Sequence, residues 1–140
     1  MPDERPAPTR PAAVTPSGLA AVTLSSGGVT ADITRRTITP PRDSWYFPRY
    51  PGLTRIVPLD GLAAAIRGFV ADHRALFTDE IQFGAWINPD SRLCYLDLIT
   101  QLPDQAEAER MARRYGVEGG RKVVAIYNPV RALTVRLGGG

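Results

Sequence analysis

Two alternating stretches joined by a short polar turn constrain the fold of this chain more than any other feature of its sequence. Every second side chain is apolar along residues 81–88, and the alternation returns along residues 93–100. This period of two is that of a β-strand, and Asn88-Pro89-Asp90-Ser91 between the stretches has the composition of a turn. The sequence therefore predicts a β-hairpin and, with it, an antiparallel sheet.

Two helices are predicted to flank this hairpin. Apolar side chains recur along residues 59–77 at intervals of three and four, which is the spacing of one helix face. A second helix is expected after Pro103, where Asp104 and, three residues later, Glu107 resemble a capping box. Gly116 is the expected C-terminal cap of this second helix.

Two further strands are predicted towards the end of the sequence. Residues 121–127 are apolar on both faces, which is typical of a central strand, and residues 132–137 alternate weakly, as an edge strand does. The predicted fold class is therefore α+β: a small, mainly antiparallel sheet with two helices on one face, in the order α-β-β-α-β-(β), over residues 53–137. Residues 138–140 are expected to fray.

The first 52 residues are predicted to lie outside this core. Residues 1–18 are Pro-rich and hold few side chains that can bury apolar surface, so a disordered tail is expected. Residues 19–52 are predicted to be an extended arm, with a β-hairpin around Ser25-Ser26-Gly27-Gly28. The arm ends in an aromatic loop that we expect to pack across the core, with an exposed docking patch as the alternative. Its aromatic residues are Trp45, Tyr46, Phe47 and Tyr50.

Composition places the chain in a broad class. Its 140 residues are enough for one domain, and its net charge of +3 permits nucleic-acid binding without requiring it. A single cysteine excludes an intrachain disulfide, and no apolar run approaches the roughly 18 residues that a membrane-spanning helix needs. We therefore expect a cytoplasmic protein without membrane association.

Few residues carry the marks of catalysis or metal binding. His73 is the sole histidine, which excludes a two-histidine metal site, and Cys94 lies within a strand, where a buried thiol behaves as a small apolar group. Asp97 interrupts an otherwise apolar run and needs a polar partner or an exposed face. A structural contact is predicted for Asp97, and the alternatives are ligand binding or acid–base chemistry together with His73. No cofactor and no metal ion are predicted.

Basic residues and an aromatic residue form the basis of a nucleic-acid hypothesis. Arginine binds phosphate and aromatic rings stack on bases, although no established nucleic-acid-binding motif is present. The residues that would carry this function are Arg35, Arg36, Trp86, Arg110, Arg113 and Arg114.

The hairpin also carries a resemblance. Gly84-Ala85-Trp86-Ile87-Asn88-Pro89-Asp90, followed by Tyr95-Leu96-Asp97-Leu98, an acidic-capped helix and a short strand, resembles small uncharacterised proteins of actinobacteria and their phages. The likeness covers residues 81–127, about a third of the chain, and this sequence departs from it at residues 117–120, which look like an insertion. The resemblance implies an actinobacterial or phage context and supplies no catalytic residues.

These observations favour a non-enzymatic interaction or accessory protein, of a phage or its host. The Pro-rich arm and the aromatic loop are predicted to bind another protein. The alternative is a small basic module that binds nucleic acid.

Overall fold

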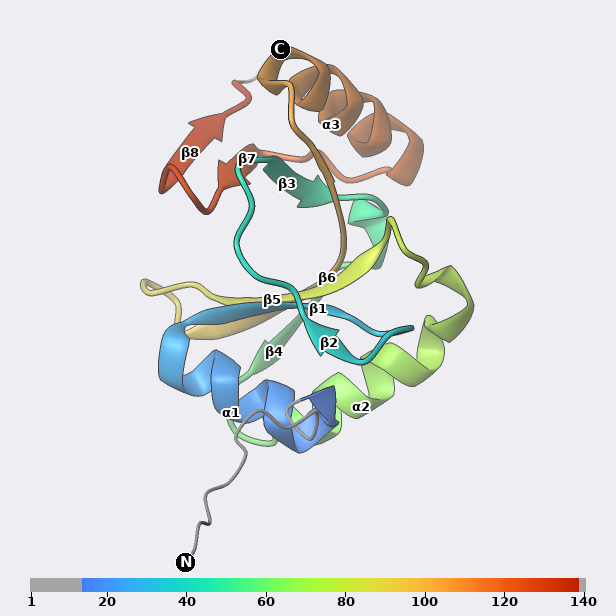
Figure 1. Ribbon diagram of the computed structural model, residues 1–140, viewed down its shortest axis with the longest axis vertical. Helices are drawn as coiled ribbons and strands as arrows, with labels where there is room; N and C mark the ends of the chain where they lie inside the picture. The colour runs from blue at the N-terminus through green and yellow to red at the C-terminus, as the bar shows by residue number, and fades with distance from the viewer. Residues whose placement is uncertain (1–13, 139–140) are drawn as a thin grey trace, which may run out of the picture.

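An eight-stranded antiparallel sheet organises residues 14–138, the part of the chain that the computed structural model describes (Figure 1). Its strands are β1 (Gly28–Asp32), β2 (Thr37–Ile38), β3 (Trp45–Pro48), β4 (Arg55–Pro58), β5 (Gln82–Ile87), β6 (Leu93–Leu102), β7 (Ala125–Asn128) and β8 (Leu133–Arg136). Three α-helices pack on the sheet: α1 (Pro16–Ser26), α2 (Leu62–Asp72) and α3 (Gln105–Gly119). Short 3₁₀ turns form at η2 (Pro51–Leu53) and η3 (Arg74–Leu76).

Strand β6 is the axis of the sheet, whose order is β2-β1-β5-β6-β3-β7-β8. One edge of β6 pairs with β5, which confirms the predicted hairpin. Its other edge pairs first with β4, from Leu93 to Leu96, and then with β3, from Ile99 to Leu102. The connection between β3 and β4, which contains η2, therefore lies beside the middle of β6.

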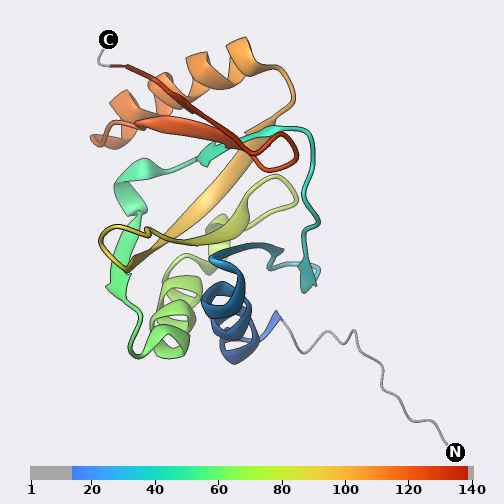
Figure 2. The same ribbon diagram turned by 90° about the vertical axis from the view of Figure 1, so that its left-hand side faces the viewer.

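The helices cover the sheet at two different places. In Figures 1 and 2, α1 and α2 lie side by side beneath β1, β5 and β4, whereas α3 lies at the opposite end of the molecule, against β3 and β7. The first hydrophobic cluster joins α1 and α2 to Phe83, Cys94 and Leu98, among others. The second joins α3 to Trp45, Phe47 and Ile126, among others.

The two predicted helices thus do not pack together in one layer as expected, because α2 belongs to the first cluster and α3 to the second. Side chains alternate along a strand, so Leu98 and Leu102 leave β6 on the same side. Leu98 packs in the first cluster and Leu102 packs against the second. The right-handed twist of β-strands accounts for this, because it turns one side of a long strand from one helix layer towards the other.

The predicted arm is part of the domain. The hairpin predicted around residues 25–28 is wrong, because Pro16–Ser26 forms α1. The Thr15 hydroxyl accepts a hydrogen bond from the Gly18 N–H, and Gly27 ends the helix at a φ of 88°, a left-handed conformation that favours glycine. Leu19 and Ala20 of α1 are buried. Residues 19–52 therefore supply α1 and three strands, and the predicted tail overlaps α1 at residues 16–18; its first 13 residues lie outside the described part.

The C-terminal elements also differ from the prediction. From α2 onwards the order is α-β-β-α-β-β, but α1 and four strands precede it. The strand predicted over residues 121–127 begins only at Ala125, and β7 lies next to the edge of the sheet instead of at its centre. Asp104 caps α3 as predicted, by accepting a hydrogen bond from the Glu107 N–H. The helix continues past Gly116 and is capped by Gly120. No helix within residues 14–138 is long and apolar enough to span a membrane.

Candidate functional site

One face of the sheet carries an aligned row of exposed apolar side chains. Phe83 and Ala85 of β5 point into the first cluster, so Gly84 and Trp86 lie on the opposite face. The register places Trp86 opposite Tyr95 of β6, and Tyr95 opposite Ile56 of β4. We call the surface formed by Ile56, Gly84, Trp86, Leu93, Tyr95 and Asp97 the open face.

Aromatic contact defines the centre of the open face. The Trp86 and Tyr95 rings lie with their centroids 5.6 Å apart and their planes tilted by 49°. The Trp86 side chain is nevertheless 52% exposed, and Ile56 is 41% exposed. The helices that contact β5 and β4, α1 and α2, pack on the other side of these strands. Apolar side chains that lie in one row across β4, β6 and β5 are therefore accessible to solvent.

Asp97 lies beside this row, two residues after Tyr95 along β6. It is opposite Gly84 and on the same side of β6 as Tyr95. The Thr54 hydroxyl donates a hydrogen bond to the Asp97 carboxylate. Burial raises the pKa of Asp97, while the bond from Thr54 and the positive charge of Arg121 act in the opposite direction. Asp97 is therefore a partly buried carboxyl group for which becoming charged is costly.

The two other residues considered for chemistry lie in structural positions. His73 ends α2, and its ring packs edge-on against Phe69, with centroids 4.8 Å apart. Cys94 is fully buried in the first cluster, and burial raises the pKa of its thiol. The hydrogen bond that reaches Asp97 comes from Thr54 on the β3–β4 connection, a residue that the sequence analysis did not single out.

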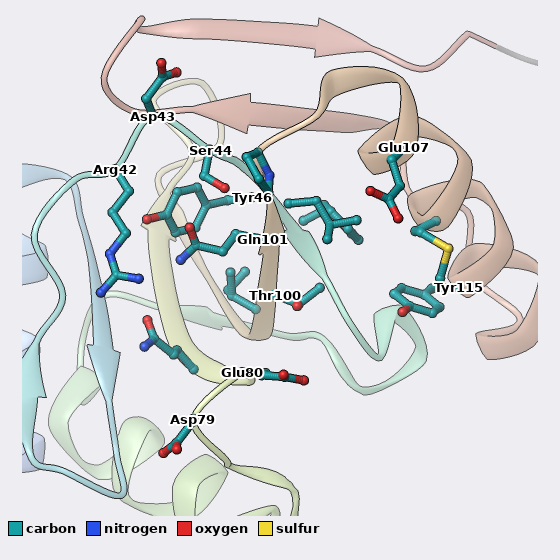
Figure 3. A pocket seen from close by; sticks show the side chains of 16 residues that line it. Arg42, Asp43, Ser44, Tyr46, Asp79, Glu80, Thr100, Gln101, Glu107 and Tyr115 are labelled. Atoms are coloured by element: carbon teal, nitrogen blue, oxygen red, sulfur yellow. The ribbon is translucent and has the colours of Figure 1, made fainter.

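A cleft of about 620 Å³ opens beside the other end of β6. Figure 3 shows Tyr46 and Gln101 near one another in it, with Arg42 on one side and Glu107 and Tyr115 on the other. Burial raises the pKa of Tyr46, and the charge of Arg42 and a hydrogen bond with Gln101 oppose this effect. The cleft thus has a mixed polar and aromatic lining.

Two carboxylates of the cleft are held by arginines. Asp43 accepts hydrogen bonds from Asn128 at 2.8 Å and from Arg131 at 2.9 Å, and these bonds lower its pKa. Asp79 pairs with Arg35 at 3.1 Å. Both groups hold loops of the fold in place. The part of the chain that the structure describes contains no group of three or more His, Cys, Asp or Glu side chains able to hold a metal ion.

The aromatic segment predicted for interaction is divided between several environments. Trp45 and Phe47 are each 2% exposed and belong to the second cluster. Tyr46 lines the cleft, and Tyr50 packs against the first cluster. Arg49 lies over both the Tyr50 ring, at 4.6 Å, and the Tyr115 ring, at 4.0 Å. The segment mainly connects the two clusters, so most of its aromatic area faces the protein interior.

The residues singled out for nucleic-acid binding come from three separate elements. Arg35 and Arg36 lie in the turn between β1 and β2, Trp86 is in β5, and the remaining three arginines are in α3, at the far end of the molecule (Figure 1). Several are already paired: Arg35 with Asp32 and Asp79, Arg113 with Glu109, and Arg114 with Glu118.

Sequence reasoning thus found Trp86 and Asp97 but assigned them to different functions. The alternation along residues 93–100 already placed Tyr95 and Asp97 on one side of a strand. What it could not supply was the pairing that brings Ile56 and Trp86 beside them. No protein-family model, no curated protein and no solved structure matches this chain.

Proposed function

We propose that this protein is a non-enzymatic interaction protein that binds another protein through its open face. The observation that carries the proposal is the half-exposed Trp86 ring, which contacts the Tyr95 ring in a tilted arrangement at the centre of an apolar row. Single exposed apolar side chains are common and need no explanation, but an aligned group of them marks an interaction site.

The composition of the open face supports a protein partner. Tryptophan and tyrosine are enriched among the residues that dominate binding energy, and charged residues are depleted at the centre of an interface. The row Ile56–Tyr95–Trp86 is uncharged, with Asp97 as the neighbouring acid. Its rigid backbone, held by pairing on both sides of β6, means that little conformational entropy is lost when a partner binds.

Nucleic-acid binding is the second candidate, and Trp86 is the observation that favours it. An exposed indole can stack on a base, with a gain of about 1–3 kcal/mol per base. Binding of this kind also needs cations that follow the phosphate backbone. The arginines Arg35, Arg113 and Arg114 are instead paired with carboxylates, and α3 is distant from β5, so we favour the protein partner.

Capture from a lysate tests the proposal. The tagged full chain, its Trp86→Ala variant and a control variant, Tyr127→Ala, are each incubated with lysate of an actinobacterium, the context that the hairpin resemblance implies. Tyr127 is a suitable control because it is 45% exposed on β7, away from the open face. Each sample is divided and one half is treated with nuclease. The captured protein is then purified and its Kd is measured against the three chains.

We expect one protein to be retained after nuclease treatment, with a Kd raised at least tenfold by Trp86→Ala and unchanged by Tyr127→Ala. Equal binding by all three chains would refute the open face as the binding surface. Capture that disappears with nuclease and weakens steeply with salt would instead support the nucleic-acid function.

A further inference from the structure

The two rings on the open face form a surface that attracts positive charge. The face of an aromatic ring carries partial negative charge, and a cation within about 6 Å of the ring centroid is stabilised by it, most strongly on tryptophan. Trp86 and Tyr95 present two rings 5.6 Å apart and tilted by 49°, so a flat cation that stacks on the exposed indole also approaches the phenol.

A carboxylate lies within reach of the same position. Residues two apart along a strand are separated by about 6.5–7 Å, so Asp97 is one step from Tyr95 and, across the pair, Gly84 is one step from Trp86. Gly84, opposite Asp97 on β5, has no side chain, and the side chain of Ile99, the next residue on this side of β6, fills the space over it. Asp97 is intermediate between buried and exposed residues.

Within residues 14–138, the hydrogen bonds to the Asp97 carboxylate leave some of its acceptor positions unused. It accepts one from the Thr54 hydroxyl, whereas an ionised carboxylate has about four acceptor positions. None of the ion pairs among residues 14–138 includes Asp97, and Arg121 acts on it from beyond salt-bridge distance. A cation that reached this group would therefore compensate a charge that the fold leaves incompletely paired.

The chain itself contains the combination of an aromatic ring and a carboxylate around one arginine. The Arg55 guanidinium lies 5.3 Å from the centroid of the Phe69 ring, and it pairs with the Asp72 carboxylate at 3.0 Å. The Arg49 guanidinium likewise lies over aromatic rings, those of Tyr50 and Tyr115. Arginine suits such sites better than lysine, because its planar group stacks on rings and bonds a carboxylate with two parallel N–H groups.

We propose that the open face binds an arginine side chain of its partner, with the guanidinium stacked over Trp86 and Tyr95 and hydrogen-bonded to Asp97. This inference rests on the proposed function and names the group that the open face recognises. The apolar row then contacts the aliphatic part of that arginine and its neighbours, and Asp97 selects the charged end.

A titration with a minimal probe tests the inference on the full chain. The probe is N-acetyl-arginine amide, and its matched control is N-acetyl-citrulline amide, which has the same shape without the charge. The signals are the indole N–H resonance of Trp86, assigned with Trp86→Phe, and the side-chain carboxyl resonance of Asp97. The second signal needs no substitution, so it remains informative if a variant fails to fold. Asp97→Asn is compared with Asp90→Asn, which alters a carboxylate in the exposed β5–β6 turn.

We expect the arginine probe to shift the Trp86 resonance and to bind about tenfold more tightly than the citrulline probe. Asp97→Asn should remove this preference, and Asp90→Asn should keep it. In the unaltered chain, the arginine probe should also lower the pH at which the Asp97 carboxyl resonance titrates, because the cation favours the ionised form.

Equal shifts from both probes, or an unchanged Asp97 titration, would overturn the inference. This failure is distinguishable from failure of the proposed function. If Trp86→Ala abolishes capture of the partner while the two probes behave alike, the open face binds a protein but does not select arginine. If Trp86→Ala leaves capture intact, the proposed function itself is wrong.

Discussion

The two faces of the β5–β6 hairpin both carry large apolar side chains, but those side chains lie in different environments. On one face, Phe83, Leu96 and Leu98 are at most 1% exposed beneath α1 and α2. On the other, Trp86 is half exposed although it is the largest side chain of the hairpin. The side chains of the two faces alternate along the same two strands. Burial here is therefore decided by where the helices pack and not by the residues of the strand alone.

The two tryptophans of the chain differ in exposure in the same way. Trp45 lies in the second cluster against α3, with 2% exposed, whereas none of the helices within residues 14–138 packs over the 52% exposed Trp86. A tryptophan buries a large apolar area, so leaving one in water forgoes stabilisation that the fold gains elsewhere. This cost is consistent with a surface whose apolar area is covered in a complex.

The largest predicted effect comes from opening a cavity on the covered face. Phe83→Ala removes a fully buried ring that packs edge-on against Phe69, with centroids 6.1 Å apart. We expect a loss of about 3–5 kcal/mol in the free energy of unfolding, measured by urea denaturation. Trp86→Ala on the open face should cost about 1 kcal/mol or less. Similar losses for both variants would mean that the two faces are equally buried in solution.

A smaller effect is predicted where α3 contacts the β3–β4 connection. A Cβ atom on Gly52 would collide with the Gly119 backbone carbonyl, which no side-chain rotation relieves. We expect Gly52→Ala to lower the free energy of unfolding by about 1–3 kcal/mol.

Gly68 lies inside α2, and a Cβ atom added there would make only an ordinary contact, with the Arg55 side chain at 3.8 Å. Gly68→Ala should therefore stabilise the protein by about 0.5–1 kcal/mol, because alanine favours the helix. Changes of the same sign in both melting temperatures would contradict this pair.

The sequence predicted the elements whose signals are local. The hairpin along residues 81–100, the edge strand at residues 132–137 and the Asp104 cap each depend on periodicity or on one side chain bonding a nearby backbone group. The same local reasoning failed for α1. Its Val and Thr residues favour strands and its Ser residues favour turns, and the cap at Thr15 followed by Pro16 lies in a Pro-rich context that suggested disorder.

The candidate site depends on long-range packing, which the sequence pattern does not contain. The alternation placed Tyr95 and Asp97 on one face of the strand and Cys94 and Leu96 on the other. It did not indicate which of the two faces a helix would cover. That choice is made by α1 and α2, through Leu19, Ile66 and Phe69 of the first cluster. The pairing of β4 with β6, which brings Ile56 beside Tyr95 and Thr54 beside Asp97, is also non-local.

Folding shifts the pKa values of two aspartates of the sheet, Asp32 and Asp97, in opposite directions from the ordinary value. Burial acts to raise the pKa of Asp32, but hydrogen bonds from the Arg35 N–H and the Thr34 hydroxyl, together with the Arg35 guanidinium, outweigh it and lower the value. Burial raises the pKa of Asp97, and the bond from Thr54 does not reverse the shift. Unfolding returns both groups to the ordinary value near 3.8.

Because the two pKa values differ from the unfolded value in opposite directions, Asp32 and Asp97 contribute to stability in different pH ranges. The folded state favours ionised Asp32, so its contribution is present above pH 3.8 and is lost as the pH falls through the lowered pKa. The folded state favours protonated Asp97, so its contribution is present below pH 3.8 and is lost as the pH rises through the raised pKa. Urea denaturation of the unaltered chain, Asp32→Asn and Asp97→Asn across this pH range measures both. Relative to the unaltered chain, Asp32→Asn should become less destabilising towards acid, and Asp97→Asn should become less destabilising, or even stabilising, towards neutral pH. Two differences that change in the same direction with pH would show that Asp97 is charged in the folded protein, already paired with a cation, and would leave no incompletely paired carboxylate on the open face.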